Sequence, residues 1–258
     1  MQLDAFRRWT ERLHANLATD PRVIGLVMLG SSAEAGRTPD QWSDHDFFVI
    51  TTSGDQERFR TDLGWLPDAE QIVLRPRETA HGLKVLFADG HLIEFAVFDL
   101  DELRMARAND YRVLLDKADG AINAALAEIA RPSESHAFDR EREMALVLSL
   151  LLVGAGRVAR GEVLSGQRFI KDFAFSGLLR LIAHEIPAAV GSRPDNLDPF
   201  RRVEASYPAL AKELQAVLLL EPLASAGALL TFIETHLRDV PAQAVQVVRD
   251  VLREAGTG

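Results

Sequence analysis

Two apolar runs, each next to a short polar motif, limit the folds open to this chain more than any other feature does. The first run, Val23 to Leu29, ends at Gly30-Ser31, and the second, Phe47 to Thr52, follows Asp44-His45-Asp46. Apolar runs of this length are typical of buried strands. Residues two apart on a strand face the same side, roughly 7 Å apart. Asp44 and Asp46 should therefore stand together at the head of the second strand, while His45 faces the opposite side and packs there.

The Gly-Ser turn and the acid pair together outline a site for a ligand that carries phosphate. Two acids side by side repel each other unless a cation lies between them. A glycine lets the backbone approach a phosphate closely. The N–H groups and hydroxyls of Gly30, Ser31 and Ser32 should lie where a helix begins, a position that holds anions. The sequence therefore predicts a phosphate-binding turn beside a carboxylate pair that can bind Mg²⁺.

Glu94 is a further acid in an unusual setting. Asp89-Gly90 is a strong hairpin signal between two apolar arms, and Glu94 lies in the second arm between apolar neighbours. An unpaired carboxylate is costly to bury among such residues, which points to a function for this one. Asp99 and Asp101 are nearby alternatives, but they follow the strand and fit better as acids at a helix N-terminus.

The patterns predict an α+β chain of two domains, 1–130 with a small mixed sheet and 131–258 as an all-α helical bundle. Ile72 to Leu74 is expected as an edge strand, and strand signals cease after about residue 100. The segment from Asp101 to Lys117 is therefore expected to be helical, with Lys117 closing the helix. Pro132-Ser133 should open a long central helix with Ser133 as its N-cap. Further helices are expected at 3–17, 32–40, 56–63, 121–131, 167–185, 198–219, 222–238 and 241–254.

Composition argues against several classes of function. The net charge of −9 disfavours a nucleic-acid partner. The absence of cysteine excludes disulfides, thiolate zinc sites and cysteine nucleophiles. The longest apolar stretch, Met144 to Ala155, is too short to span a bilayer, and the N-terminus lacks the apolar core of a signal sequence. We expect a soluble cytoplasmic protein, a monomer or homodimer, with neither membrane nor nucleic acid as a partner.

The motif resembles the signature of the nucleotidyltransferase superfamily that includes DNA polymerase β and the antibiotic adenylyltransferases. Leu29-Gly30-Ser31 and Asp44-His45-Asp46-Phe47 match that signature in identity, order and spacing. Only His45 is more polar than the usual middle residue. The family also needs a third carboxylate between apolar residues on a later strand, and Glu94 fits this position. The resemblance implies that Asp44, Asp46 and Glu94 are the catalytic residues and bind two Mg²⁺ ions, while Gly30, Ser31 and Ser32 hold the phosphates of ATP.

The first 120 residues or so resemble the aminoglycoside adenylyltransferases more closely, and Tyr111 to Gly120 looks like a segment of the streptomycin 6-adenylyltransferase group. The resemblance implies a catalytic domain at 1–130, a substrate-binding helical domain at 131–258, and an acceptor held between them. In several relatives a basic residue of the helical domain reaches the triphosphate. Lys171 is the candidate here, although a solvated lysine on an amphipathic helix is the simpler interpretation.

We therefore expect a Mg²⁺-dependent nucleotidyltransferase that moves AMP from ATP to a hydroxyl of a small molecule, with an aminoglycoside as the first candidate. Two metal ions about 4 Å apart would orient the triphosphate. Glu94 would serve as the third metal ligand or as the general base for the acceptor hydroxyl. Two alternatives stay open: an antitoxin-type adenylyltransferase that modifies a protein partner, and a non-catalytic nucleotide-binding regulatory module. The helical half counts against the first, and the three intact acids count against the second.

Overall fold

The structure, a computed structural model, describes residues 2–34, 38–108, 110–129, 138–192, 194–195 and 198–257. The chain divides into two compact units, residues 1–133 and residues 134–258. Among the described residues, no helix is both long enough and apolar enough to cross a membrane.

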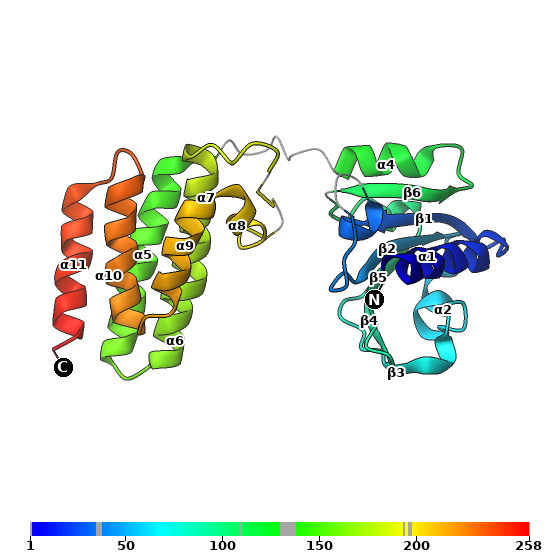
Figure 1. Ribbon diagram of the computed structural model, residues 1–258, viewed down its shortest axis with the longest axis horizontal. Helices are drawn as coiled ribbons and strands as arrows, with labels where there is room; N and C mark the ends of the chain where they lie inside the picture. Colours follow the sequence, from blue (N-terminus) through cyan, green and yellow to red (C-terminus); the bar gives the residue numbers. More distant parts are fainter. Residues whose placement is uncertain are drawn as a thin grey trace. The chain divides into compact units, whose positions relative to one another are not determined.

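The first unit is built on a six-stranded mixed sheet with the order β3-β4-β5-β2-β1-β6 (Figure 1). The strands are β1 (Val23–Leu29), β2 (His45–Thr51), β3 (Ile72–Leu74), β4 (Gly82–Phe87), β5 (Leu92–Phe98) and β6 (Tyr111–Asp116). All neighbouring strands are antiparallel except β2 and β5, which run parallel. The expected α+β fold with a small mixed sheet is confirmed, and Ile72–Leu74 is the edge strand that the sequence predicts.

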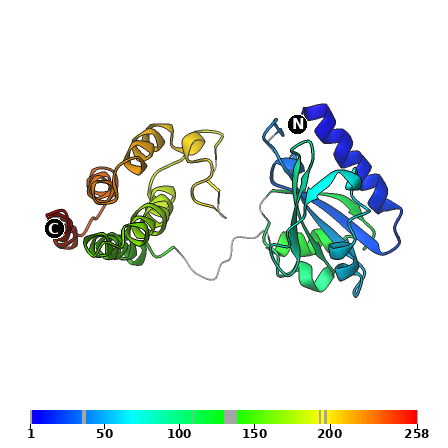
Figure 2. The ribbon, with the colours of Figure 1, turned by 90° about the horizontal axis from the view of Figure 1, so that it is seen from below.

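Helices cover both faces of this sheet (Figure 2). On one face, α1 (Leu3–Ala18) contributes Trp9 and Leu13 to a core that contains Phe47 of β2. On the other face, α3 (Leu100–Leu103) and α4 (Ala121–Ile129) pack over Phe48, the next residue of the same strand. Alternate residues of β2 are thus buried on opposite sides, as strand geometry requires. The short helix α2 (Gln56–Thr61) follows β2.

The prediction of a helix from Asp101 to Lys117 is wrong. Helix α3 ends at Leu103, and Tyr111–Asp116 forms β6 at the edge of the sheet, antiparallel to β1. Hydrogen bonds to a partner distant in sequence fix this strand, and the local pattern of apolar residues does not show them. Lys117 therefore closes no helix, and its ammonium group donates to the carbonyl oxygen of Asp20 at 2.9 Å.

The acids after β5 do begin a helix. The Asp99 carboxylate accepts hydrogen bonds from the N–H groups of Asp101 and Glu102, and Glu102 completes a capping box. The interpretation of Asp99 and Asp101 as acids at a helix N-terminus is confirmed.

The helix expected over 32–40 is replaced at its start by a short 3₁₀ turn, η1 (Gly30–Ala33). Glu34 ends the turn with a left-handed backbone (φ 52°). Within that expected helix, residues 35–37 lie outside the described part of the chain, and 38–40 are not helical.

The second unit is an all-α bundle, as predicted. Its elements are α5 (Arg140–Ala159), α6 (Val163–Arg168), the π-helical segment η3 (Phe169–Ala174), α7 (Phe175–Glu185), α8 (Val203–Ser206), α9 (Pro208–Leu218), α10 (Pro222–His236) and α11 (Ala242–Ala255). Helix α5 is central, since α6, α7, α10 and α11 all contact it. The expected cap Ser133 lies outside the described residues. Asp139 caps the helix instead, because its carboxylate accepts from the N–H of Arg142 at 2.9 Å.

Candidate functional site

The candidate site lies on the α4 side of the sheet in the first unit, at the edge where β2 and β5 begin. Asp46 of β2 is the direct partner of Glu94 on the parallel strand β5. Neighbouring strands lie about 4.8 Å apart, so these two side chains leave the same face side by side. Asp44 immediately precedes β2. The structure thus brings Asp46 and Glu94 together and places Asp44 at the entrance of the same strand.

One buried hydroxyl fastens the Gly-Ser turn to these acids. The Ser32 hydroxyl donates to the carbonyl oxygen of Asp44 and accepts from the N–H of Asp46, both at 3.2 Å. Ser32 is 1% exposed, so its hydroxyl is buried between the turn and β2. The hydroxyl of Ser32 therefore holds the turn in place, and Ser31 remains half-buried beside it.

Gly30 is the residue of the turn that only glycine fits well. Its backbone is left-handed (φ 53°), and a Cβ there would lie 3.4 Å from the Oδ2 of Asp46. Its N–H donates to the carbonyl oxygen of Asp110 at 3.0 Å. The turn therefore approaches the Asp46 carboxylate closely through bare backbone, which is the geometry that a phosphate-binding turn beside a metal-binding acid needs.

His45 lies between the two acids in sequence but faces the opposite side of the sheet, as expected. It is fully buried and stacks on Phe6 of α1 with ring centroids 3.5 Å apart. Its Nδ1 lies 2.7 Å from the Nε2 of His91, and its Nε2 lies 3.0 Å from the hydroxyl of Thr10. Burial lowers the pKa of His45 to about 3 and the pKa of His91 to about 4. Both imidazoles are therefore neutral near pH 7 and serve as polar core residues.

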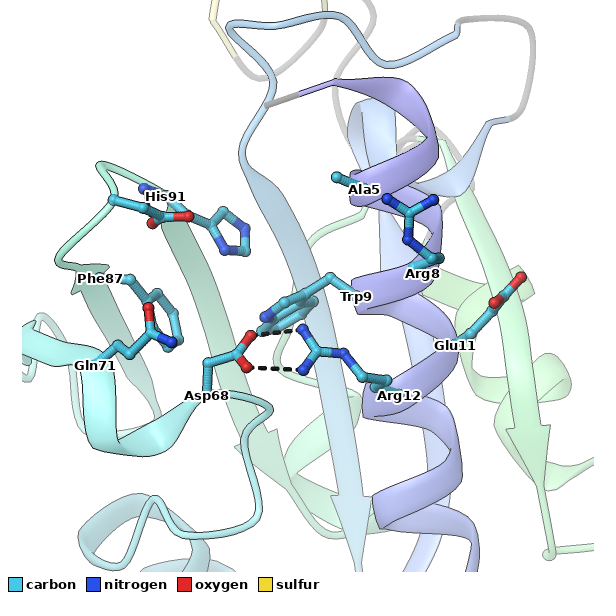
Figure 3. A pocket seen from close by; sticks show the side chains of 10 residues that line it. Ala5, Arg8, Trp9, Glu11, Arg12, Asp68, Gln71, Phe87 and His91 are labelled. Carbon is cyan, nitrogen blue, oxygen red and sulfur yellow. Dashed lines mark hydrogen bonds and ion pairs between the residues drawn. The ribbon is translucent and has the colours of Figure 1, made fainter.

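A cavity of about 440 Å³ opens beyond this histidine pair, on the α1 side (Figure 3). Trp9 reaches from α1 toward Phe87 and His91, and an ion pair between Arg12 and Asp68 spans the opening. The cavity lies on the face of the sheet opposite to the acids.

Lys84 is the residue at the acid face that sequence reasoning missed. Its ammonium nitrogen lies 2.8 Å from Oε1 of Glu94 and 3.3 Å from Oε1 of Glu78. On the antiparallel strand β4, Lys84 is the direct partner of Glu94. Lys84, Glu94 and Asp46 therefore form a row across three adjacent strands, and the lysine neutralises part of the negative charge.

The hairpin loop explains why Lys84 was missed. A two-residue loop at Asp89-Gly90 would pair Lys84 with Phe95 and turn the lysine to the other face. In the structure the loop has three residues, because the N–H of Phe87 bonds to the carbonyl of His91 and Gly90 has a left-handed φ of 86°. Gly90 is compatible with either loop length, since three-residue hairpin loops also place a glycine at their left-handed last position. The sequence therefore contained a signal for the longer loop as well.

The carboxylates of this row, Asp46 and Glu94 (the acid row), suit a magnesium ion that binds together with a nucleotide. Mg²⁺ is commonly held by one or two carboxylates together with substrate phosphates. Asp46 and Glu94 supply such oxygens in register, with Asp44 adjacent. Within the described ranges, no three acidic or histidine side chains are gathered into a complete metal site. The donors therefore fit a site that the phosphates of a substrate would complete.

Lys171 lies on η3 in the second unit, where it has partners of its own. Its ammonium group donates to the carbonyl oxygen of Leu218 at 2.9 Å and to that of Leu220. These carbonyls lie at the C-terminal end of α9, where a helix leaves acceptors unsatisfied. In this structure the Lys171 side chain thus ties η3 to the end of a neighbouring helix.

Comparisons with known proteins give one extensive match. Residues 10–188, which include all of the candidate site residues, match the model of the streptomycin adenylyltransferase family. An aminoglycoside 6-adenyltransferase from Bacillus subtilis is 14% identical, with 96% of this chain and 90% of that chain covered and a TM-score of 0.33. The CD-NTase CdnG from Bradyrhizobium diazoefficiens, solved in complex with GTP, is 16% identical, with 99% and 90% covered and a TM-score of 0.27. No curated protein sequence matches the chain.

Proposed function

Since the chain belongs to the streptomycin adenylyltransferase family and is a nucleotidyltransferase, we propose that it transfers AMP from ATP to a hydroxyl group of a small molecule. We further propose that the reaction needs Mg²⁺ and that the acceptor is an aminoglycoside. The name of the family supports both the adenylyl donor and this class of acceptor. Residues 1–130 form the proposed catalytic domain and residues 131–258 the proposed substrate-binding domain.

The observation that carries the proposal is the register of Asp46 with Glu94 beside the Gly30 turn. Two carboxylates lie on one face of the sheet, and the Gly30 turn reaches them through a residue without a side chain. This arrangement suits a metal ion bound together with the phosphates of a nucleotide. The acids match the cation, and the turn matches the phosphates. We assign Asp44 and Asp46 to the metal and Gly30, Ser31 and Ser32 to the phosphates.

In the proposed reaction the acceptor oxygen forms a bond to the α-phosphorus while the bond from that phosphorus to the bridging oxygen breaks. Pyrophosphate leaves with the electron pair of that bond. Bound Mg²⁺ supplies charge neutralisation for the phosphates. The residues of the chain position the substrates, because the turn fixes the triphosphate. Glu94 either accepts the proton of the acceptor hydroxyl or completes the metal site. Such a site accelerates transfer mainly through orientation and electrostatic stabilisation.

The test is pyrophosphate release from ATP and Mg²⁺ across a panel of aminoglycosides, lincosamides and other hydroxyl-bearing antibiotics. We expect release with at least one aminoglycoside, and loss of at least about 100-fold in kcat/KM for Asp46→Asn, which keeps the shape but removes the charge. Circular dichroism of the variant confirms that it is folded. Equal activity in wild type and Asp46→Asn would refute the role of this acid.

The same assay separates the two roles of Glu94. If Glu94 is the general base, Glu94→Gln keeps metal-dependent ATP binding but loses transfer. If it is a metal ligand, Glu94→Gln loses both. Release only in the presence of a protein substrate would support the antitoxin-type function instead. ATP binding without release for any acceptor would support a regulatory module.

A further inference from the structure

Arg7 of α1 forms a bidentate ion pair with Glu34, the residue that ends the η1 turn. The Nε of Arg7 donates to Oε1 of Glu34 at 3.2 Å, and Nη2 donates to Oε2 at 2.9 Å. The neighbouring guanidinium lowers the pKa of the Glu34 carboxyl, first through these hydrogen bonds. The two planar groups face each other in a paired geometry that a lysine does not reproduce.

This ion pair ties the end of the turn to α1. The near end of the turn is held by the hydrogen bonds of Gly30 and Ser32. Beneath the far end, a cavity of about 420 Å³ lies between α1 and β6, with Arg7, Thr10, Glu34, Arg112 and Leu114 in its lining. The ion pair therefore connects Glu34 to α1 across this cavity.

We propose that Arg7 is a positioning residue for the nucleotide, and that it acts through Glu34 to hold the Gly30–Ser32 turn in its phosphate-binding position. The inference rests on the proposed function, because it assumes that this turn binds the triphosphate. Arg7 itself contacts Glu34 and no acid of the row. Its loss should leave the acids in place and allow the turn to shift away from the phosphates.

The chain contains a matched control on the same helix. Arg12 of α1 forms a bidentate pair with Asp68, with distances of 2.7 Å and 2.5 Å, and this pair also spans a cavity (Figure 3). The arginine and acid side chains are 48% and 22% exposed in the Arg7–Glu34 pair, against 52% and 30% in the Arg12–Asp68 pair. The two pairs differ in what they hold, since Asp68 precedes the short 3₁₀ turn Ala69–Gln71 and not the phosphate-binding turn.

The experiment compares Arg7→Gln and Glu34→Gln with Arg12→Gln and Asp68→Asn. ATP binding is measured by calorimetry without acceptor, and KM for ATP and kcat are measured with the best acceptor. We expect the first two variants to weaken ATP binding and raise KM for ATP about two- to fivefold, the range for loss of a partly exposed ion pair. The value of kcat should change less than twofold, and the control variants should bind ATP like the wild type.

Two further measurements separate a positioning role from a general loss of stability. The melting temperatures of Arg7→Gln and Arg12→Gln should fall by similar amounts. Hydrogen exchange should rise at residues 30–34 in Arg7→Gln and stay unchanged there in Arg12→Gln.

Equal ATP affinity in Arg7→Gln and Arg12→Gln, with a wild type that binds ATP, would overturn this inference and leave the proposed function intact. Hydrogen exchange that rises equally at residues 30–34 in Arg7→Gln and Arg12→Gln would also overturn it. A wild type that neither binds ATP nor releases pyrophosphate with any acceptor would overturn the proposed function and this inference with it.

Discussion

The ammonium nitrogen of Lys84 lies 2.8 Å from a carboxylate oxygen of Glu94, its direct partner across the β4–β5 hairpin. Both side chains are about one-third exposed, so the pair contributes little to folding stability. We expect the pair to orient Glu94, because the ammonium group holds one of its two carboxylate oxygens. Glu78, at 3.3 Å from the same nitrogen, gives the lysine a second partner.

Replacement of Lys84 by glutamine should lower kcat/KM about tenfold. Without the ammonium group, Glu94 loses its anchor and stands near Glu78 with no cation between them. Pyrophosphate release measures the effect. Lys117→Gln is the matched control, since that lysine bonds to the Asp20 carbonyl oxygen and should keep kcat/KM within twofold. Wild-type kcat/KM in Lys84→Gln would show that Glu94 needs no such anchor.

Substitution of Gly30 by alanine should abolish ATP binding at a moderate cost in stability. A Cβ at this left-handed position costs about 1–2 kcal/mol. It would lie 3.4 Å from the Oδ2 of Asp46, on the side where we propose that the phosphates bind. Gly54→Ala serves as the control, because Gly54 is also left-handed (φ 94°) but a Cβ there would meet no atom within 4 Å. Both variants should melt earlier, whereas only Gly30→Ala should lose ATP binding in calorimetry. Equal binding by both variants would contradict the proposed phosphate contact.

The stability of the first unit should fall between pH 7.5 and pH 5.5. His45 and His91 are buried as neutral bases with pKa values lowered to about 3 and about 4, so their unfolded forms bind protons at a higher pH than their folded forms. Their contribution to stability is complete above pH 6.5 and is lost as the pH falls toward the folded values. The expected loss is roughly 3 kcal/mol for the two groups together.

Urea unfolding followed by tryptophan fluorescence checks this pH dependence, because Trp9, Trp42 and Trp65 are the three tryptophans and all lie in the first unit. Asp20 does not contribute in this window, since its pKa is lowered to about 2 by Arg22. An unfolding midpoint that is the same at both pH values would show that the histidine pair is not buried as described.

Gly166→Ala should destabilise the helical unit by about 1–3 kcal/mol, the usual cost of an overpacked contact. A Cβ there would lie 2.5 Å from Val158 and 2.8 Å from the carbonyl oxygen of Gly154, so α5 and α6 would have to separate. Gly227→Ala in α10 is the control, since no atom lies within 4 Å of a Cβ there, and alanine should stabilise that helix by about 0.5–1 kcal/mol. Thermal unfolding followed by circular dichroism at 222 nm distinguishes the two. A Gly166→Ala variant that melts with the wild type would refute the close α5–α6 contact.

The features that sequence patterns predicted are those encoded locally. Strand β1, the Gly30 turn and the Asp44 to Asp46 signature follow one another within a short segment, and each has its own composition and spacing. Glu94 was identified because its apolar neighbours are also local. Of the row of three residues, Asp46 and Glu94 were thus predictable from the sequence, and the expected role of each remains a prediction.

The features that were missed depend on pairing between distant segments. Strand β6 exists because it pairs with β1, and Lys84 faces Glu94 because a loop has three residues and not two. The contacts of Arg7 with Glu34 and of His45 with His91 likewise join elements that only the folded sheet brings together. No periodicity within a window of ten or twenty residues contains that information.

The parallel pairing of β2 with β5 has a consequence for the order of folding. These strands are joined by a long crossover that includes α2, β3 and β4, so Asp46 and Glu94 meet only after the ends of that segment have closed. Loops of this length close slowly compared with the local contacts of a helical bundle. During refolding, the helical circular dichroism signal should therefore recover before nucleotide binding does, and the acid row should be among the last parts of the molecule to become competent.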